Sequence, residues 1–449
     1  MLWLWPPVNV ARQIWQYGVN VPVVDEWVIP KLLPKVAAGT ATLGDFVAQF
    51  NEHRIAVPRL LIAMLAPWTQ GDIRGELWLA WGLAGLFSWG LARHLGWGWR
   101  YVLAHGARVF PVPVGNLRGR AVFQVLVAPQ CFGLGGCVGA ALVGRGVGAL
   151  ASFSVGSGLL VWPALVPVYQ RFGWRWLAAG AGCVGVYAWN YVRPDDRVGL
   201  ATVLAHLPQL LRYGLAFWGG PFAGGHPSLA VAIGGILVGA IAWGWRRGNR
   251  HKLGYALLIY GLLCGLLVGV GRFFDGPAQA LTSRYGPLSL CVAVGTAIVA
   301  PPLTRWWRLA LAIALVTALV PAQVAAEGTL AYLQQDRLLG KTCLLWHYQI
   351  PQRECTAKLN PNKVEVVIDR APWLDALGYL QPGLRSHRRL QPEAPGDYGY
   401  LEGQTGDRAW GWAILPFKQR YADGVVVGCN TAEGIVAVRV ADRRQPGAT

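Results

Sequence analysis

The sequence predicts an α-helical polytopic membrane protein, with about 10–11 transmembrane helices, that ends in a small extracytoplasmic domain resembling a β-sandwich. Three observations carry this prediction. The 449 residues are 54% hydrophobic and only 14% charged, whereas roughly 25% of residues are charged in soluble domains. Apolar stretches recur throughout residues 1–326, the predicted transmembrane domain. Residues 327–449, the predicted β-rich domain, regain acidic and turn-forming residues.

The apolar stretches vary in length and in regularity. Glycine and proline interrupt several of them, which transmembrane helices tolerate where neighbouring helices cover the backbone. The first is short for crossing about 30 Å of hydrocarbon. The segments that we read as spans are 56–68, 77–92, 121–143, 149–169, 176–192, 205–222, 228–245, 253–271, 286–302 and 309–326.

The charges of the loops predict the orientation. The basic loops 246–252 and 301–308 are separated by two spans and therefore share a face, which the positive-inside rule assigns to the cytoplasm. Counting outward places an acidic first loop (18–55), segment 272–285 and the tail on the opposite face. These features predict a multi-pass protein of the bacterial cytoplasmic (inner) membrane whose C-terminal domain is extracytoplasmic.

The formal net charge of +18 has a simple explanation in such a protein. Arginine and lysine in loops set orientation and favour anionic lipid headgroups, so we expect membrane lipids, and no nucleic acid, as partners. The arginine-rich stretch 93–120 fits less well, since the count places it outside. Either a span is miscounted, or these arginines bind an anion.

The tail predicts strands and a disulfide. Short runs rich in β-branched and aromatic residues alternate with turn residues, which is typical of a small antiparallel sandwich; these runs are 363–369, 410–415, 424–429 and 434–440. A disulfide between Cys343 and Cys355 is plausible if the tail faces an oxidising compartment.

A first group of candidate site residues lies in the acidic loop. Asp25 and Glu26 precede an amphipathic stretch, and Glu52, His53 and Arg54 stand where the chain enters the next span. Arg54 is a candidate for substrate binding. A carboxylate beside the bilayer could act as general base for a hydroxyl. Glu52 and His53 could transfer a proton or bind a divalent metal, Mg²⁺ or Mn²⁺, although no cofactor is required by the pattern. The alternative is a solvated loop with an interfacial Arg–Glu pair.

A second group lies in segment 271–288, between two apolar spans. It contains Arg272, Ser283, Arg284 and Tyr285. The planar guanidinium of arginine suits bidentate binding of phosphate, so these residues could hold the phosphate of a lipid carrier. The alternative is that the arginines extend from helix ends toward water and that the tyrosine belongs to an aromatic belt.

Several motifs together carry a resemblance to a known superfamily. They are "DEW" at 25–27, "NEHR" followed by "PRLL", "GNLRGRAVFQ" (115–124), "FSVGSGLLVWP" (153–163), "GR…ALTSRY" (271–285) and "GWA" (411–413). With them the chain resembles bacterial polytopic proteins that are similar to GT-C superfamily glycosyltransferases. The resemblance is diffuse but extends over most of the chain.

The resemblance implies a transferase that moves a sugar from a polyprenyl-phosphate or polyprenyl-diphosphate carrier on the extracytoplasmic face. It implies that Asp25 is the catalytic base, with Glu26 as its competitor, and that Arg272 and Arg284 bind phosphate. The chain departs from the superfamily in one respect. A full span precedes the acidic motif there, whereas the residues before Asp25 here are few and are interrupted by Arg12.

The hypothesis is therefore a membrane glycosyltransferase acting on a polyprenyl-linked sugar and a cell-envelope glycan or lipid. One alternative is a non-catalytic subunit associated with other membrane proteins, which would tolerate the loss of Asp25 and Arg284 but would fail without the tail. The other is a lipid-linked glycan transporter, which predicts charged groups at mid-membrane depth.

Overall fold

The computed structural model describes residues 5–94, 145–166, 173–192, 199–248, 251–299, 327–387 and, with breaks at 391–398, 407, 416–419 and 433, residues 389–442. The described chain is mainly helical and forms two compact units. We call Met1–Tyr17, Thr40–Leu65 and Arg74–Leu330 the first unit, and Gly18–Gly39, Ala66–Ile73 and Ala331–Thr449 the second unit. The predicted acidic loop 18–55 is thus divided between the two units.

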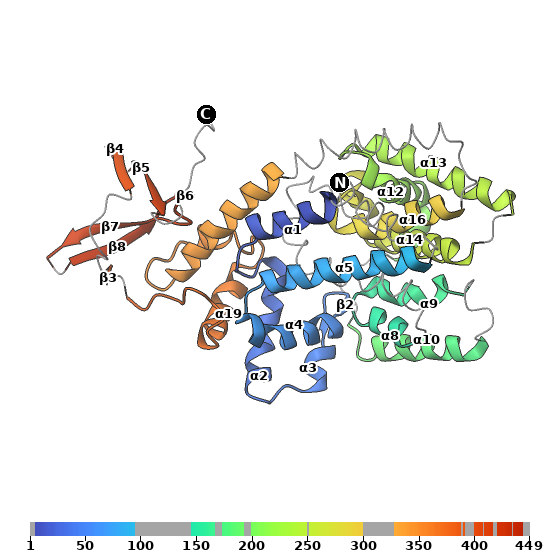
Figure 1. Cartoon of the computed structure of the whole chain (residues 1–449), viewed down its shortest axis with the longest axis horizontal. Coiled ribbons are helices and arrows are strands. Elements are labelled where there is room, and N and C mark those ends of the chain that lie inside the picture. The colour runs from blue at the N-terminus through green and yellow to red at the C-terminus, as the bar shows by residue number, and fades with distance from the viewer. Residues whose placement is uncertain are drawn as a thin grey trace. The chain divides into compact units, whose positions relative to one another are not determined.

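The first unit contains most of the helices (Figure 1). Its core is formed by large buried side chains of α12 and α14, including Tyr213, Phe217 and Tyr260. The elements are α1 (Trp5–Tyr17), α3 (Leu43–Val47), β1 (Gln49–Phe50), β2 (His53–Arg54), α4 (Ala56–Thr69, which continues into the second unit), α5 (Arg74–His94), α8 (Arg145–Ser152), η3 (Gly156–Leu160), α9 (Val161–Ala164), α10 (Gly173–Ala188), α11 (Leu200–Ala205), α12 (Leu207–Gly219), η4 (Gly220–Phe222), α13 (Pro227–Arg246), α14 (Lys252–Arg272), η5 (Phe273–Asp275), α15 (Pro277–Ala280), η6 (Ser283–Tyr285) and α16 (Gly286–Val299).

A reciprocal pair of glycines allows α12 and α13 to pack closely. A Cβ atom at Gly219 would lie 2.0 Å from the carbonyl oxygen of Ala230, and one at Gly234 would lie 2.0 Å from that of Leu215. No other residue type fits at either position without moving a helix. Small residues that let helix backbones approach in this way are common between membrane helices.

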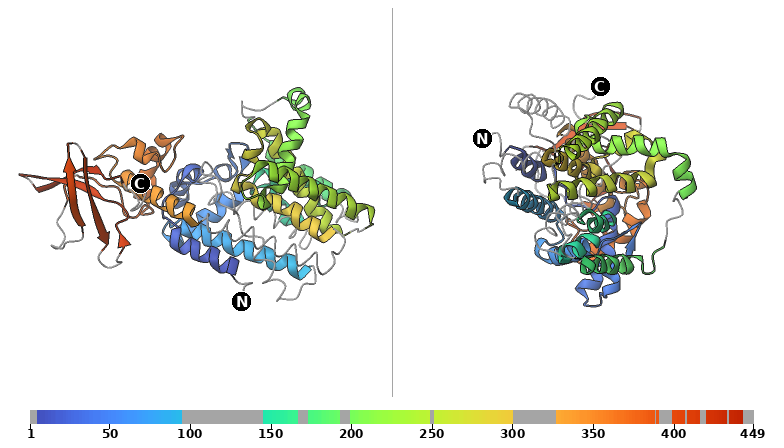
Figure 2. Two further views of the ribbon diagram at one scale, coloured as in Figure 1. Left: turned by 90° about the horizontal axis from the view of Figure 1, so that it is seen from above. Right: turned by 90° about the vertical axis from the view of Figure 1, so that its right-hand side faces the viewer.

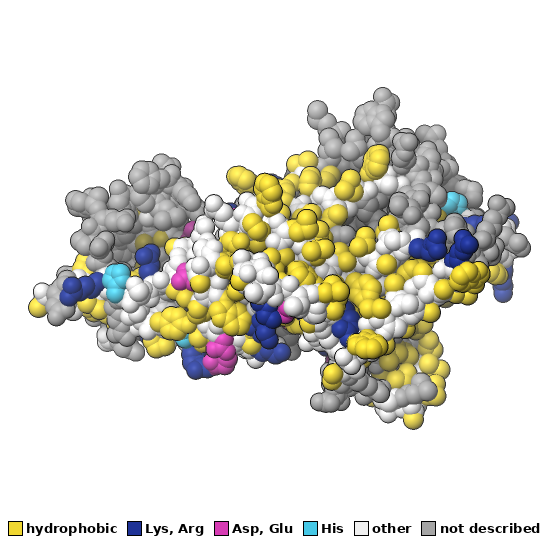
Figure 3. Space-filling view, turned by 90° about the horizontal axis from the view of Figure 1, so that it is seen from below, with side chains coloured by type: hydrophobic (Ala, Val, Ile, Leu, Met, Phe, Trp, Pro, Cys, Tyr) yellow, Lys and Arg dark blue, Asp and Glu magenta, His cyan; other side chains and the backbone are white. Residues whose placement is uncertain are grey.

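Two helices within the described residues are long and apolar enough to cross a membrane. They are α13, with 20 residues, and α14 continued by η5 (Lys252–Asp275), with 24 residues. The most apolar stretch of α13 is only 17% buried, against 56% for α14, so α13 presents side chains such as Ile236 and Trp245 on its surface. Figure 3 shows hydrophobic side chains over much of the face that it draws. Exposed apolar surface of this extent is typical of faces that contact lipid or another protein.

The other predicted spans appear as shorter, broken or less apolar helices. Segments 56–68 and 286–302 correspond to the 14-residue helices α4 and α16, and 176–192 to the 16 residues of α10. Segment 77–92 lies in α5, while 149–169 is broken into α8, η3 and α9, and 205–222 begins in α11 and continues in α12 and η4. Segments 121–143 and 309–326 lie outside the described residues. A crossing by more than two helices therefore stays a prediction.

The second unit has a helical part and a strand part. The helical part contains η1 (Val24–Lys31), α2 (Leu33–Ala37), a helix over 327–345 that begins in the first unit, α18 (Arg353–Thr356) and α19 (Val364–Ala376). The strand predicted at 363–369 is wrong, because these residues begin α19. The β-branched run favours a strand locally, but Val367, Ala371 and Leu374 are buried at helical spacing, so packing overrides the local preference.

The strand part forms two antiparallel three-stranded sheets with orders β3-β8-β7 and β4-β5-β6. The predicted strands 410–415, 424–429 and 434–440 correspond to β5, β7 and β8, the second with bounds shifted by two residues. Figure 2 shows the strands in orange-red. Most side chains of β4 are exposed, so the sandwich packing of these sheets stays a prediction. The bounds are β3 (Arg389–Leu390), β4 (Gly399–Thr405), β5 (Arg408–Leu415), β6 (Arg420–Tyr421), β7 (Val426–Thr431) and β8 (Gly434–Val440).

Candidate functional site

The two acids of the "DEW" motif lie in the second unit, in the first turn of η1. Glu26 is 3% exposed, and its Oε2 accepts a hydrogen bond of 2.7 Å from the backbone N–H of Val23. Glu26 also interacts electrostatically with Arg337 of the helix over 327–345. Asp25 is only half-buried. The two neighbouring acids therefore differ in burial, and Glu26 is the more buried of the two.

Three residues of the tail form hydrogen bonds with the backbone of residues 23–27, which we call the acidic turn. The N–H of Val24 donates to the carbonyl oxygen of Leu359 at 2.7 Å, and the side-chain amide of Asn360 donates to the carbonyl oxygen of Val24 at 3.2 Å. The guanidinium of Arg370, in α19, donates to the carbonyl oxygen of Trp27. The acidic turn and the helical part of the tail are consequently one folded structure.

Burial lowers the pKa of Arg337, while the Glu26 carboxylate acts in the opposite direction. This direction has a simple cause, because a cation loses hydration when it is buried and regains stabilisation from a nearby anion. A buried carboxylate without a cation would be costly. The opposite charges of Glu26 and Arg337 thus offset part of the cost of their burial.

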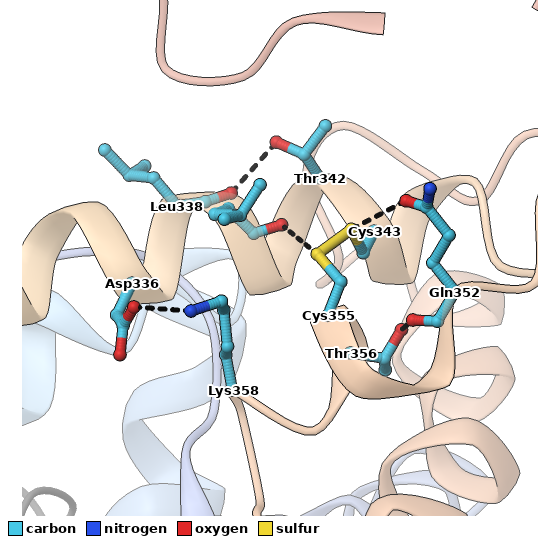
Figure 4. The surroundings of a disulfide bond; sticks show 9 residues. Asp336, Leu338, Thr342, Cys343, Gln352, Cys355, Thr356 and Lys358 are labelled. Carbon is cyan, nitrogen blue, oxygen red and sulfur yellow. Dashed lines mark hydrogen bonds and ion pairs between the residues drawn. A yellow bond between two sulfur atoms is a disulfide. The ribbon is translucent and has the colours of Figure 1, made fainter. Parts of the chain in front are cut away.

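A disulfide joins Cys343, near the end of the helix over 327–345, to Cys355 in α18, as the sequence suggested (Figure 4). Cys355 Sγ lies 3.6 Å from the carbonyl oxygen of Leu339. One turn earlier on the same helix, Asp336 accepts a hydrogen bond of 2.8 Å from Lys358 Nζ. The covalent bond and the ion pair attach the 353–358 segment, which leads into Leu359, to this helix.

Glu52, His53 and Arg54 belong to the short β1–β2 hairpin of the first unit. Oε1 of Glu52 lies 4.0 Å from Nε2 of His53. Nδ1 of His53 accepts a hydrogen bond of 3.2 Å from the N–H of Gly156. Because Nδ1 is used as an acceptor, the neutral ring carries its proton on Nε2, toward Glu52. This arrangement supports a structural hydrogen bond better than proton transfer by His53.

Arg54 is 7% exposed, and its guanidinium donates hydrogen bonds to three backbone carbonyl oxygens. It donates to the carbonyl oxygens of Tyr187 at 2.8 Å, Val47 at 2.8 Å and Trp189. Tyr187 and Trp189 stand at the C-terminal end of α10, where carbonyls lack helical partners. Arg54, which the sequence suggested as a substrate ligand, thus caps α10.

A second buried arginine, which was not among the candidates from the sequence, also donates hydrogen bonds to carbonyl oxygens at the end of a helix. Arg59, in α4, is 5% exposed and donates to the carbonyl oxygens of Phe46 at 2.9 Å and Ala48 at 2.5 Å. These carbonyls lie at the C-terminal end of α3. The only sequence signal was an arginine three residues after the start of a predicted span, where a charge needs a partner.

The residues of segment 271–288 gather around Tyr213 of α12. Arg272, Arg284 and Asp275 all interact electrostatically with its hydroxyl. The Tyr213 hydroxyl donates to Oε1 of Gln279, and Nε2 of Gln279 donates to the Tyr285 hydroxyl at 3.3 Å. We call Tyr213, Arg272, Gln279, Arg284 and Tyr285 the tyrosine–arginine cluster.

Arg284 is the member of this cluster with unused hydrogen-bonding capacity. Its Cζ lies 4.8 Å from the ring centroid of Tyr285, which is within the range of a cation–π contact. Its Nε is buried and has no hydrogen-bond partner among the described residues. Arg272 is 45% exposed and lies 3.8 Å from the carboxylate of Asp275. The backbone of Ser283 belongs to η6, and its side chain lies outside the described residues.

The predicted site residues thus fall into three groups. Arg272, Arg284 and Tyr285 come together in the tyrosine–arginine cluster, Glu52, His53 and Arg54 form the hairpin, and Asp25 and Glu26 belong to the second unit. In the described part of the chain, no group of three or more His, Cys, Asp or Glu residues is arranged to hold a metal ion. No protein-family model, curated protein or solved structure matches the chain.

Proposed function

We propose that the chain is a membrane glycosyltransferase that binds the phosphate of a polyprenyl-linked sugar donor at the tyrosine–arginine cluster. One observation carries the proposal. Two arginines interact electrostatically with the same tyrosine hydroxyl, and the buried Nε of one of them has no protein partner among the described residues. A phosphate oxygen would supply the missing acceptor. Charge-assisted hydrogen bonds from guanidinium to phosphate are stronger than neutral ones.

The cluster has parts suited to a departing phosphate. The guanidinium groups of Arg272 and Arg284 would stabilise the negative charge that develops on the leaving oxygen. Gln279, held between two tyrosine hydroxyls, would keep the cluster rigid. The N-terminal end of α16 directly follows Tyr285, and helix N-termini favour anions.

In the proposed reaction, an acceptor hydroxyl attacks the anomeric carbon, the bond from that carbon to the phosphate oxygen breaks, and a carboxylate takes the hydroxyl proton. Of the two acids of the motif, Asp25 is the one that the resemblance names as the base, and Glu26 is almost completely buried. The role of Asp25 rests on the resemblance to GT-C glycosyltransferases.

The experiment compares Arg284→Ala, Arg284→Lys and the control Arg247→Ala, which removes an arginine of the basic loop 246–252. Binding of a polyprenyl phosphate and sugar transfer would be measured with purified protein in detergent. Arg284→Ala should reduce transfer by about 100-fold or more, the size of effect seen when a group that stabilises charge is removed. Arg284→Lys should restore only part, because a lysine lacks the planar fork. Unchanged binding by Arg284→Ala would overturn the proposal.

A second candidate, a non-catalytic subunit, is favoured by one surface. Tyr400 of β4 pairs with Trp412 of β5, and Trp410 projects from the same face because residues two apart on a strand share a face. These side chains are 65%, 42% and 51% exposed. If the chain is a binding subunit, Asp25→Asn should leave envelope glycans unchanged, whereas Trp410→Ala with Trp412→Ala should abolish co-purification of its membrane partners.

A further inference from the structure

The side chain of Gln279, in α15, forms hydrogen bonds with two tyrosine hydroxyls that belong to other elements. The hydroxyl of Tyr213, in α12, donates to Oε1 of Gln279. Nε2 of Gln279 donates to the hydroxyl oxygen of Tyr285, in η6, at 3.3 Å. Tyr213 is completely buried and Tyr285 is 8% exposed, so water competes little for these bonds.

The direction of the two bonds distinguishes the two hydroxyls. A tyrosine hydroxyl has one proton to donate, whereas an amide accepts at its oxygen and donates from its nitrogen. Tyr213 therefore uses its proton in the bond to Gln279, while Tyr285 accepts there and keeps its own proton. Among the described residues, no acceptor takes the proton of the Tyr285 hydroxyl. A donor in so buried a residue needs an acceptor.

A second unused donor lies over the ring of the same tyrosine. The Arg284 guanidinium has its Cζ 4.8 Å from the ring centroid of Tyr285, and its buried Nε has no partner in the part of the chain that the structure describes. Tyr285 thus carries one unused O–H group and contacts the side chain that carries an unused N–H group. A phosphate has several acceptor oxygens and can accept from both.

We infer that Gln279 is a positioning residue, which reserves the Tyr285 proton for the phosphate by donating to the oxygen of that hydroxyl. The phosphate is then bound by the O–H of Tyr285 as well as by Arg284. This ligand, the phosphate of a polyprenyl carrier, is that of the proposed function, on which the role of Gln279 rests. The role itself concerns the direction of a hydrogen bond, and a substitution can reverse that direction.

Gln279→Glu reverses the direction with little change of shape. A carboxylate only accepts, so Tyr213 and Tyr285 would both donate to it, and the Tyr285 proton would be withdrawn from the phosphate. The added negative charge also repels phosphate directly. Because this repulsion does not depend on the hydroxyl of Tyr285, a double-mutant cycle with Tyr285→Phe separates the two effects.

Thr282→Val is a matched control. Oγ1 of Thr282 donates to the backbone carbonyl oxygen of Gln279 at 2.6 Å, so the substitution removes a hydrogen bond from the same residue and leaves the amide side chain untouched. A general loosening of segment 277–285 would follow from Thr282→Val as well. Loss of a phosphate donor would follow only from changes at Gln279 and Tyr285.

The test is a calorimetric titration of the full chain in detergent with a polyprenyl phosphate. A parallel titration with inorganic phosphate separates recognition of the anion from recognition of the lipid. Tyr285→Phe should weaken binding by about tenfold or more, the usual effect of losing a hydrogen bond to a charged group. Gln279→Glu should weaken binding at least as much in the wild-type background, but clearly less in the Tyr285→Phe background. Thr282→Val should bind as the wild type does.

The pH profile gives a readout that a merely structural role would not change. Gln279→Glu should regain affinity relative to the wild type between pH 8 and pH 5, because a protonated carboxyl donates from one oxygen and accepts at the other, as the amide does. Burial favours this neutral form. The charged groups around the Tyr213 hydroxyl, which are the same in both proteins, are Arg272, Asp275 and Arg284.

Additive losses in the cycle, or an equal loss in Thr282→Val, would overturn the role of Gln279. A larger loss in Tyr213→Phe than in Tyr285→Phe would also overturn it, because Tyr213 would then hold the spare proton, and this comparison decides if Gln279→Glu does not fold. Loss of binding in Arg284→Ala without loss in Tyr285→Phe would overturn the inference alone. Weaker binding by Tyr285→Phe in a chain that transfers no sugar would overturn only the transferase. A wild-type chain that binds no phosphate would overturn both.

Discussion

The Nδ1 atom of His53 accepts a hydrogen bond from the backbone N–H of Gly156 at 3.2 Å, and this bond joins the β1–β2 hairpin to a break in a helix. The chain leaves α8 at Ser152 and re-enters helical structure as η3 at Gly156. At the break, the carbonyl oxygen of Phe153 accepts from the N–H of Val57 at 3.0 Å. Backbone groups of Phe153 and Gly156 at the break thus form hydrogen bonds with the hairpin and the start of α4. In apolar surroundings, backbone groups released by a break in a helix need such partners.

Gly156→Ala should break the hydrogen bond between His53 of the hairpin and the backbone at the start of η3. A Cβ atom there would lie 2.8 Å from Nδ1 of His53 and 3.1 Å from the hydroxyl of Tyr187, so the imidazole must move and its hydrogen bond is lost. The expected cost is about 1–3 kcal/mol, measured as a lower midpoint of unfolding in detergent. Gly146→Ala in α8 is the control, because a Cβ there meets nothing within 4 Å. Equal midpoints for the two variants would contradict the assigned contact.

Arg54→Lys should destabilise the protein and leave donor affinity intact. A lysine has one charged nitrogen and cannot reach the carbonyls of Val47, Tyr187 and Trp189 together. Carbonyls left without a donor should cost about 1–3 kcal/mol, which urea denaturation of the purified protein would measure. A weaker binding of polyprenyl phosphate without a change in stability would instead support the ligand role first suggested by the sequence.

Replacing Cys343 and Cys355 with serine should destabilise the second unit. The disulfide closes a loop with a sequence separation of 12, for which the chain-entropy model gives about 3 kcal/mol. Hydrogen exchange of peptides from α18 and η1 should rise, because the disulfide supports the segment that binds Val24. Cys429→Ser is the control, since Cys429 is exposed and unpaired by any disulfide. No difference between the two variants would mean that the ion pair between Lys358 and Asp336 is sufficient to attach segment 353–358 to the helix over 327–345.

His347 should make the stability of the second unit dependent on pH. Burial, assisted by the charge of Arg353, lowers its pKa below the usual 6.5, and its Nδ1 is buried without a partner among the described residues. Between the folded pKa and 6.5 the unfolded chain binds more protons, so the free energy of unfolding falls as the pH is lowered through this window. Denaturation at pH 7.5 and pH 5.5 should show this loss, and His347→Gln should reduce it. An equal loss in the variant would exclude His347 as its source.

Predictions from the sequence succeeded where local pattern decides the structure. The long apolar runs of α13 and α14 were predicted within a few residues, because length and composition define such helices. Three strands of the tail were likewise evident from β-branched and aromatic runs. The strand predicted for the run beginning at Val364 was wrong. Its residues favour a strand locally, but Val367 and Leu374 are buried on one face of a helix.

Contacts between distant segments could not be predicted. Arg54 was identified as a charged group beside a span, but two of the three carbonyl oxygens that accept its hydrogen bonds lie more than 130 positions away. Glu26 was likewise indistinguishable from Asp25 in sequence, because the two differ in their burial within the folded second unit. One sequence shows charge and hydropathy, and neither indicates which residue pairs with which.

The hydrogen bonds between the acidic turn and the tail also constrain the order in which the protein folds during synthesis. Val24 and Asn360 are hydrogen-bonded at a separation of 336 residues, so a ribosome completes most of the chain before the turn meets its partners. The second unit must therefore fold after synthesis of the helices has ended. A chain cut short near residue 330 would keep its apolar helices and lose the structure around Asp25, which makes the helical part of the tail a condition for a correctly formed acidic turn.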